Sequence, residues 1–340
     1  MDAPQGHETE IGIAADAIRR GELVVFPTET VYGLGGNATD PNAAAAIYAA
    51  KGRPSDNPLI IHVANPEDAE PYAVTTSAYY RLARRFMPGP LTLILKKKPT
   101  VPLTVTGGLD TVAVRCPAHP VARALIAAAG VPIAAPSANL SGRPSPTTAK
   151  HAAEDLFGRV SYIIDGGEAE IGLESTIVAL DGDRGVLLRP GAVTPEELSE
   201  ELSSFEISPA VTAGLKENER PLSPGMKYKH YAPRAPLTLL SGDATAFYRY
   251  LDALSDKEHV GVLCFKEDLP FIKPPLTIFP IGNRADLRAQ SHCFFAALRD
   301  ADENPSLTHL YAHLPPTSGL GLALYNRALR AAAHTVITLT

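Results

Sequence analysis

The chain of 340 residues has no tryptophan, and only 6% of its residues are aromatic. Its three cysteines, Cys116, Cys264 and Cys293, are far apart and form no CxxC pair. An odd number of widely spaced cysteines argues against a disulfide framework or a zinc ribbon and is typical of a reducing compartment. No apolar run approaches the roughly 18 residues that a membrane-spanning helix needs, and the polar N-terminus has no signal-peptide pattern. We therefore expect a soluble, cytoplasmic protein with no membrane partner.

Positive charge is concentrated in one part of the chain. The net charge of −6 argues against broad non-specific binding of nucleic acid. Residues 51–150, however, hold 12 Lys or Arg and 5 Asp or Glu, a net charge of +7. A basic segment in an acidic protein predicts a local anionic ligand, such as a nucleotide or an RNA backbone. For the run Lys96–Lys98 alone, a solvated strand end is the alternative.

Short apolar runs alternate with Ala-rich helical patterns over the first two hundred residues, and this order is typical of an α/β domain. The segment 41–52 shows the pattern, with Pro41 at the start of a predicted helix and Gly52 at its end. At roughly 150 residues a domain, the length suggests two domains. We predict an α/β domain over 1–205, a Pro- and Gly-rich linker over 206–236, and a smaller α/β domain over 237–340.

The sequence lacks the phosphate-binding motif GxxxxGK[ST], so it is no P-loop enzyme. GLGG at 33–36 does not have the GxGxxG spacing, and the glycines at 319–321 favour a tight turn before a helix. Lys51 and Arg53 lie just past a predicted helix end. Two cations so close, beside Gly and Pro, suit phosphate oxygens, but cations also cap helix ends, and the segment alone leaves both interpretations open.

Other candidate sites are weaker. The loop 135–142 ends an apolar strand with hydroxyl and amide side chains, which suit anion binding or a plain turn. His309 and His313 are four residues apart on a predicted strand, and that spacing does not favour a metal pair. Cys116 beside Arg115 is interpreted as a small buried residue.

Seven motifs together carry a family resemblance: FPTETVYGLG from Phe26, KGRP from Lys51, NPL from Asn57, PGPLT from Pro88, VR at 114–115, PSAN from Pro136, and ESTI from Glu174. They resemble the YrdC family, whose signature is the K-x-R and S-x-N pair. The segment MKYKHYAPRAPL at 226–237 and the second α/β domain resemble the long, two-domain form, so the resemblance covers essentially the whole chain. It implies a twisted, mixed β-sheet domain with flanking helices, followed by a Rossmann-like α/β domain.

This resemblance implies a reaction. The two-domain form makes L-threonylcarbamoyladenylate from ATP, L-threonine and bicarbonate and releases pyrophosphate, and the product supplies the threonylcarbamoyl group of an adenosine beside the anticodon of tRNA. The expected cofactor is Mg²⁺ with ATP, without an organic cofactor, and no carboxylate cluster specifies the metal site. The expected partners are the three substrates and, through the released adenylate, a threonylcarbamoyl transferase, with tRNA contact weak or indirect.

The resemblance also implies site residues, carried over motif by motif. The expected catalytic pair is Lys51 and Arg53. L-threonine would be held by Thr30, His62, Arg115, Ala135 and Ser175. ATP would be held by Arg53, Asn57, Thr111, Ser137, Ser145, Arg189 and Tyr231. Without the family, His62 would be interpreted as a core histidine, and Thr30 and Ser175 as turn hydroxyls.

Two further hypotheses concern the linker and a different class of function. Tyr231 lies in the polar linker, which we predict to close over the site as a lid, because the threonylcarbamoyl product is prone to hydrolysis. The alternative function is a double-stranded RNA-binding module without catalysis. The scarcity of aromatic stacking residues argues against it.

Overall fold

The computed structural model describes residues 7–213 and 230–340, which form two compact units. The first unit comprises 7–141, 146–170 and 174–213, and the second comprises 142–145, 171–173 and 230–340. The predicted linker and lid, 206–236, falls in large part on 214–229, which lie outside the described residues. No helix in the described part of the chain combines the length and apolarity needed to cross a bilayer.

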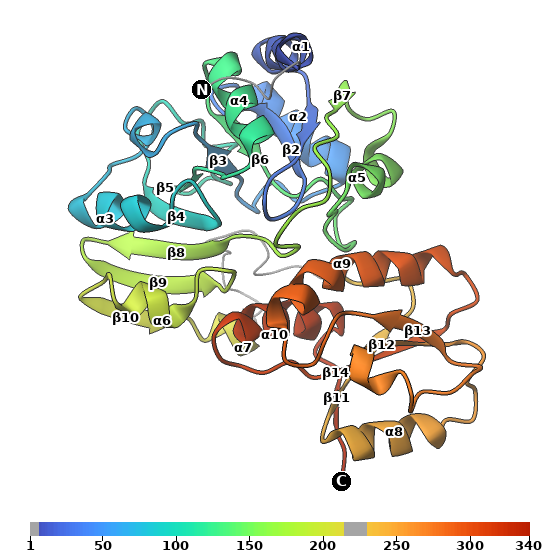
Figure 1. Cartoon of the computed structure of the whole chain (residues 1–340). Coiled ribbons are helices and arrows are strands. Elements are labelled where there is room, and N and C mark those ends of the chain that lie inside the picture. The colour runs from blue at the N-terminus through green and yellow to red at the C-terminus, as the bar shows by residue number, and fades with distance from the viewer. Residues whose placement is uncertain (1–6, 214–229) are drawn as a thin grey trace. The chain divides into compact units, whose positions relative to one another are not determined.

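The first unit is built on a ten-stranded sheet in the order β10-β9-β8-β4-β5-β3-β6-β2-β1-β7 (Figure 1). Its strands are β1 (Val24–Phe26), β2 (Gly33–Asn37), β3 (Ile60–His62), β4 (Leu91–Lys96), β5 (Thr111–Arg115), β6 (Ile133–Ala135), β7 (Tyr162–Ile163), β8 (Thr176–Asp181), β9 (Arg184–Arg189) and β10 (Ser204–Ile207). The sheet contains both parallel pairs, such as β3 with β5, and antiparallel pairs, such as β4 with β5. The predicted mixed sheet is thus confirmed.

Seven helices of the first unit are described: α1 (Glu8–Arg19), α2 (Pro41–Lys51), α3 (Ser77–Phe86), α4 (Pro120–Ala129), α5 (Ala149–Leu156), α6 (Pro195–Ser199) and α7 (Ala210–Ala213). In α2 the Asp40 side chain accepts a hydrogen bond from the Asn42 N–H, and Gly52 ends the helix in the left-handed conformation. That conformation costs glycine little. The predicted bounds of this helix are therefore confirmed.

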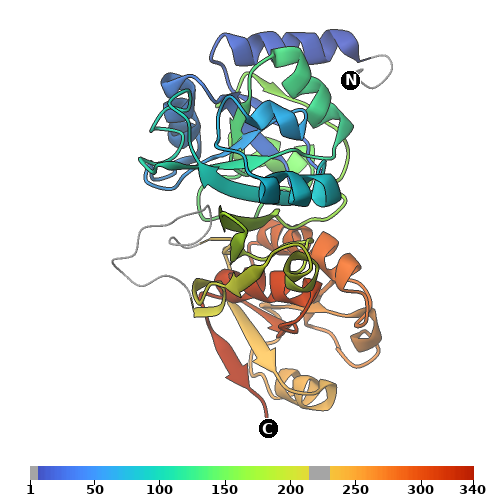
Figure 2. The same cartoon turned by 90° about the vertical axis from the view of Figure 1, so that its left-hand side faces the viewer.

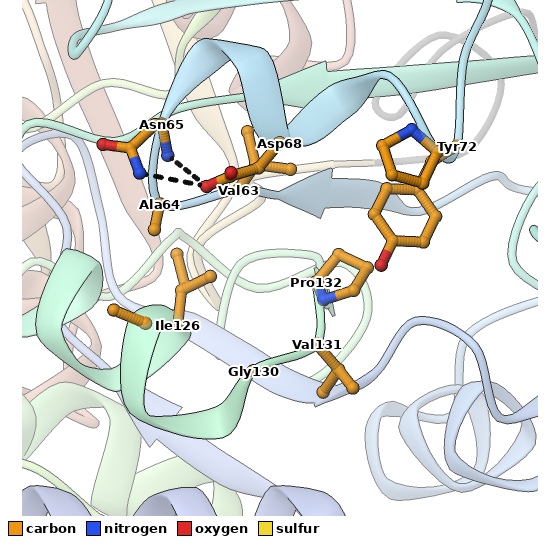
Figure 3. Close-up of a pocket in the computed structure, with 11 residues that line it drawn as sticks. Val63, Ala64, Asn65, Asp68, Tyr72, Ile126, Gly130, Val131 and Pro132 are labelled. Atoms are coloured by element: carbon orange, nitrogen blue, oxygen red, sulfur yellow. Dashed lines mark hydrogen bonds between the residues drawn. The ribbon is translucent and has the colours of Figure 1, made fainter.

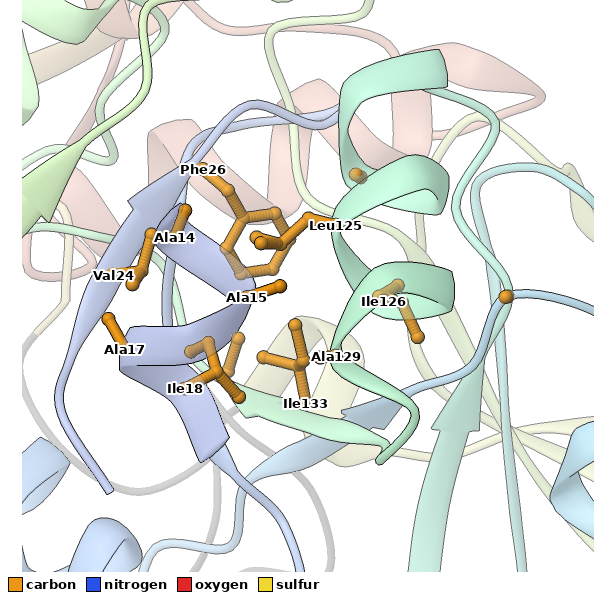
Figure 4. Packing of buried hydrophobic residues seen from close by; sticks show 13 residues of the cluster. Ala14, Ala15, Ala17, Ile18, Val24, Phe26, Leu125, Ile126, Ala129 and Ile133 are labelled. Carbon is orange, nitrogen blue, oxygen red and sulfur yellow. The ribbon is translucent and has the colours of Figure 1, made fainter. Parts of the chain in front are cut away.

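Small residues let α1 and α4 approach each other closely over the sheet (Figure 4). Ala14 and Ile18 of α1 lie in the same buried cluster as Leu125 of α4 and as Phe26 and Ile133 of the sheet. The ring of Phe26 also lies edge-on to the imidazole of His62, with ring centroids 6.0 Å apart. The core therefore supports one of the predicted site residues directly.

Three features of the first unit were not predicted from the sequence. Helix α1 precedes the first predicted element. The predicted boundary at 205 falls inside β10, which pairs in parallel with β9 and is too short to show a periodic pattern. The glycines at 33–36 form strand β2, where a Cβ on Gly35 would lie 2.7 Å from Ile133 Cγ2. They permit close packing of side chains over the strand.

The second unit is a five-stranded sheet in the order β13-β12-β14-β11-β15, and all its neighbouring strands are parallel. Its elements are β11 (Leu237–Ser241), α8 (Ala244–Asp252), β12 (Val260–Cys264), β13 (Thr277–Pro280), α9 (Leu287–Glu303), β14 (His309–His313), α10 (Leu320–Ala331) and β15 (Val336–Thr338). Strands β11 and β15 lie side by side in Figure 2. The parallel α/β class is as predicted, whereas β15 was not expected. Strand β14 lies between β11 and β12, unlike the 3-2-1-4-5 order of dinucleotide-binding sheets.

A buried carboxylate organises the edge of this second sheet. Asp268 accepts hydrogen bonds from Tyr248 Oη at 2.7 Å, from the Phe265 N–H at 2.8 Å and from His313 Nε2 at 3.0 Å. His309 Nε2 lies 2.8 Å from Thr238 Oγ1. Both histidines of the HLYAH strand thus have protein partners. Over 7–213 and 230–340, no three His, Cys, Asp or Glu side chains come close enough to hold a metal ion.

Candidate active site

Five polar side chains form a row across neighbouring strands of the first sheet: Arg189, Ser175, Thr92, Arg115 and His62. Arg115 ends β5 and is in register with His62 of β3 and with Thr92 of β4. Thr92 Oγ1 lies 2.7 Å from Ser175 Oγ, and Arg189 donates from Nη2 to Ser175 Oγ at 3.0 Å and from Nε to the Ser175 carbonyl at 2.9 Å. None of the five is more than 7% exposed. A buried polar row is costly unless its members have partners, so we treat it as the candidate site.

At the centre of the polar row lies a buried ion pair. Arg115 Nη2 donates to Glu29 Oε1 at 2.7 Å, and the Ala118 N–H donates to Glu29 Oε2 at 3.0 Å. Both oxygens of the carboxylate are therefore engaged. The guanidinium is not saturated, because its Nε is buried and has no hydrogen-bond partner within the described residues. Arg115 thus has donor capacity left for an anion.

His62 is held neutral beside this ion pair. Its Nδ1 lies 3.3 Å from the Ile133 carbonyl, which can only accept, so Nδ1 carries the proton and Nε2 is left as an acceptor. Burial lowers the pKa of His62 to about 3, and the charge of Arg115 acts in the same direction. The imidazole therefore offers a lone pair, not a positive charge, to a ligand at neutral pH.

The low pKa of His62 predicts a pH-dependent stability. Since the folded protein holds this imidazole neutral and the unfolded chain protonates it near pH 6.5, the unfolded state binds more protons between about pH 3 and pH 6.5. Stability should fall as the pH drops through this window. His62→Gln should flatten the slope by up to about 1.4 kcal/mol per pH unit. Urea unfolding between pH 4 and 7.5 measures it, and equal slopes in both proteins would contradict the neutral, buried imidazole.

The loop after β1 brings Thr30 next to the ion pair. Thr28 Oγ1 donates to the Val31 carbonyl at 2.6 Å, so the contact of 2.9 Å between the two threonine hydroxyls is donated by Thr30. The Thr30 oxygen remains an acceptor. Glu29, between these threonines, ties the loop to the end of β5. Thr30 therefore directly follows the residue that pairs with Arg115, and the assignment of both to L-threonine stays a prediction.

Lys51 organises the loop that carries the S-x-N motif. Its ammonium donates to the backbone carbonyls of Ser137 and Asn139, and Asn139 Oδ1 lies 3.5 Å away. Ser137 Oγ in turn donates to Asn139 Oδ1 at 2.5 Å. Lys51 lies at the end of α2 and is buried. Its position thus links the K-x-R motif to the S-x-N motif.

Three more predicted nucleotide ligands in the first unit are Arg53, Asn57 and Thr111. Arg53 Nη2 donates to the carbonyls of Asn57 at 3.3 Å and Pro58 at 3.1 Å. The Oδ1 atom of Asn57 is buried and, within the described chain, has no hydrogen-bond partner. Thr111 begins β5 on the same face as Arg115, four positions and roughly 13 Å along the strand from it. Ala135, predicted to contact L-threonine, ends β6 and is in register with Ile60.

Two predicted residues belong to the second unit. Ser145 is buried in the segment 142–145, where Arg299 Nη2 donates to the Pro144 carbonyl at 2.7 Å. Tyr231 is buried with a φ of 64°, and its ring centroid lies 5.1 Å from that of Phe295. The assignment of both residues to ATP stays a prediction.

Sequence reasoning gave no role to Glu29 and Thr92. Both stand inside motifs of the family resemblance, and Glu29 lies between two threonines just after an apolar strand. Their contacts come from residues 86 and 83 positions away. The available signal in the sequence was a polar residue beside apolar ones. The partner of that residue is known only once the register of the sheet is known.

A separate cavity of about 360 Å³ is lined by Val63, Ala64 and Asn65, which follow β3, and by the end of α4 (Figure 3). Asn65 donates to Asp68 Oδ2 from its N–H at 2.9 Å and from Nδ2 at 3.1 Å. No predicted site residue lines this cavity.

Comparison with known proteins decides the family. Residues 16–191 match the family model Sua5_yciO_yrdC, described as telomere recombination, and residues 193–333 match the C-terminal domain of threonylcarbamoyl-AMP synthase. The threonylcarbamoyl-AMP synthase of Bacillus subtilis is 44% identical over 334 residues, which cover 97% of this chain and 95% of the relative. The chain belongs to the threonylcarbamoyl-AMP synthase family. The member from Pyrococcus abyssi is 45% identical over 339 residues, which cover 97% of this chain and 96% of that one.

The structural comparison agrees with this family. The crystal structure of P. abyssi Sua5 complexed with L-threonine is similar at a TM-score of 0.91 and 43% identity, over 98% of this chain and 97% of that one. The resemblance to the YrdC family is therefore confirmed. So is the prediction of an enzyme, an ATP-using adenylyl transferase of the threonylcarbamoyl-AMP synthase family, over a non-catalytic RNA-binding module.

Proposed function

We propose that this threonylcarbamoyl-AMP synthase joins L-threonine, bicarbonate and ATP at the polar row and the loops beside it. The amine of L-threonine reacts with bicarbonate to give an N-carboxylate and water. An oxygen of that carboxylate attacks the α-phosphorus, the bond from this phosphorus to the bridging oxygen breaks, and pyrophosphate leaves. Because the substrate supplies the nucleophile, the protein must mainly position reactants and stabilise charge.

The observation that carries this proposal is the unsaturated guanidinium of Arg115. A buried arginine that has one carboxylate partner and, within 7–213 and 230–340, no partner for its Nε suits a second anion, and L-threonine provides one in its carboxylate. The similar P. abyssi structure contains L-threonine. With its carboxylate at Arg115, L-threonine leaves its amine free to react.

The remaining threonine ligands follow from their hydrogen-bonding capacity. His62 Nε2 and the Thr30 hydroxyl oxygen are acceptors, so they suit the hydroxyl and amine hydrogens of L-threonine. Ser175 is held by Thr92 and Arg189 and offers its hydroxyl at the other side of Arg115. Ala135 contributes only backbone.

For ATP we propose a site extending from the Lys51 and Arg53 motif to β5 and β9. Arg53 and Arg189 supply positive charge for the phosphates, and Asn57, Thr111 and Ser137 supply hydrogen bonds. Lys51 acts at the phosphate and carbamate end together with the loop carbonyls that it fixes. Ser145 and Tyr231 complete the proposed set.

Mg²⁺ is proposed to enter as the ATP chelate. Over 7–213 and 230–340 no three His, Cys, Asp or Glu side chains come together to hold a metal ion, and Mg²⁺ commonly binds through substrate phosphates and water. Bound there, it would neutralise phosphate charge.

We further propose that 1–205 is the catalytic domain and that 237–340 orients the linker. The enzyme works in the cytoplasm and hands its adenylate to a threonylcarbamoyl transferase.

Pyrophosphate release by the purified protein tests the proposed function. With Mg·ATP, release should require both L-threonine and bicarbonate, and omission of either should reduce it to background. Binding of double-stranded RNA is measured on the same sample. A folded protein that binds RNA but releases no pyrophosphate under any of these conditions would contradict the proposal.

A further inference from the structure

The buried carboxylate of Glu29 has no role in the substrate contacts proposed above, although it lies at the centre of the site. It is 6% exposed, and both of its oxygens are committed, one to Arg115 Nη2 at 2.7 Å and one to the Ala118 N–H at 3.0 Å. A buried ion pair is weak evidence for stability, because two apolar residues of similar volume often stabilise a fold equally well. Its presence here therefore calls for a functional reason.

The geometry around Arg115 supplies that reason. Arg115 is in register with His62 and Thr92 on the neighbouring strands, and within 7–213 and 230–340 neither side chain forms a hydrogen bond to the guanidinium that would fix its rotation. Its one hydrogen bond in that part of the chain is to Glu29, and its Nε is buried without a partner. Since Glu29 is itself anchored to the Ala118 backbone, it fixes the plane of the guanidinium.

We propose that Glu29 is a positioning residue, which orients the Arg115 guanidinium toward the carboxylate of the amino-acid substrate. This inference rests on the proposed function. In this role Glu29 acts through Arg115 and neither touches the substrate nor takes its amine proton, and each of its carboxylate oxygens already accepts a hydrogen bond from the protein. Its negative charge also offsets the positive charge of Arg115. Recognition of the substrate carboxylate therefore depends more on the orientation of the guanidinium N–H groups than on excess positive charge.

Glu29→Gln in the full chain tests this role, because the amide keeps the size of the side chain and loses its charge. The KM for L-threonine should rise by about 30-fold, while the KM for ATP stays within about twofold. Affinity for L-threoninol, which lacks the carboxylate, should not change. Glu201→Gln is the matched control: it removes a carboxylate from an arginine pair, 2.7 Å from Arg85 Nη1, outside the polar row.

Other outcomes overturn the inference. If kcat falls and its pH profile shifts while the KM for L-threonine is unchanged, Glu29 acts as a base. If L-threonine and L-threoninol lose affinity equally, its role is merely structural. Should Glu29→Gln fail to fold, Glu29→Asp keeps the charge but shortens the reach, and the same comparison of the two ligands applies. If the wild-type protein needs L-threonine for pyrophosphate release and the Glu29 variants behave like it, the positioning role of Glu29 is rejected and the proposed function stands. If the wild-type protein is inactive and binds no L-threonine, both the proposed function and the positioning role of Glu29 are rejected.

Discussion

Arg115→Met is expected to lower kcat/KM for L-threonine by about 10³-fold, because the substrate carboxylate loses its guanidinium partner. The same change should destabilise the protein by about 3–5 kcal/mol, since Glu29 is left as a buried charge without a counterion. Pyrophosphate release at varied L-threonine measures the first effect, and urea unfolding measures the second.

A double variant separates these two effects. Arg115→Met combined with Glu29→Gln removes both charges, and the amide oxygen can still accept the hydrogen bond from the Ala118 N–H. Most of the lost stability should return, while the activity should stay low. If Arg115→Met alone keeps the KM for L-threonine of the wild type, the carboxylate is bound elsewhere.

Lys51→Met is expected to lower kcat/KM for ATP by about 100-fold, the effect of misplacing a site by roughly 1 Å. The ammonium holds the carbonyls of Ser137 and Asn139, so its loss releases the S-x-N loop as well as a positive charge. Stability should fall by about 1–3 kcal/mol, because these carbonyls lose a charged donor. Pyrophosphate release at varied ATP gives the measurement.

Lys97→Met is the matched control for Lys51. Its ammonium also donates to a backbone carbonyl, that of Val101 at 3.1 Å, but it lies outside the candidate site. It should leave the KM for ATP unchanged. Equal losses in both variants would mean that a general loss of positive charge, and not the S-x-N loop, explains the effect.

The ends of a helix were predictable where residues at those ends determine them. Pro41 and Gly52 bound α2 as expected, because a proline fits a first helical turn and a glycine fits a left-handed cap. Strands β10 and β15 are only four and three residues long, too short for a periodic pattern. Each strand forms by pairing with another strand: β10 pairs with β9, and β15 pairs with β11, which is distant in the sequence.

The candidate site was predictable as a set of residues but not as a set of contacts. The motifs identified Arg115, His62 and Ser175, yet the sequence did not indicate that Glu29 would pair with an arginine 86 positions away. Lys51 shows the same limit. Phosphate binding and helix capping were the two interpretations left open for it, and neither indicated that its ammonium would reach carbonyls 86 and 88 positions along the chain. Such contacts depend on strand order and register.

The most direct test of the proposed chemistry is the mass of the adenylate formed from ATP, L-threonine and carbon-13 bicarbonate. With the threonine carboxylate held by Arg115, the oxygen that attacks the α-phosphorus must come from the new N-carboxylate. The product should therefore be threonylcarbamoyl-AMP, and it should carry one labelled carbon. An unlabelled threonyl-AMP, formed without bicarbonate, would show that the amino-acid carboxylate itself attacks, and it would contradict the proposed role of Arg115.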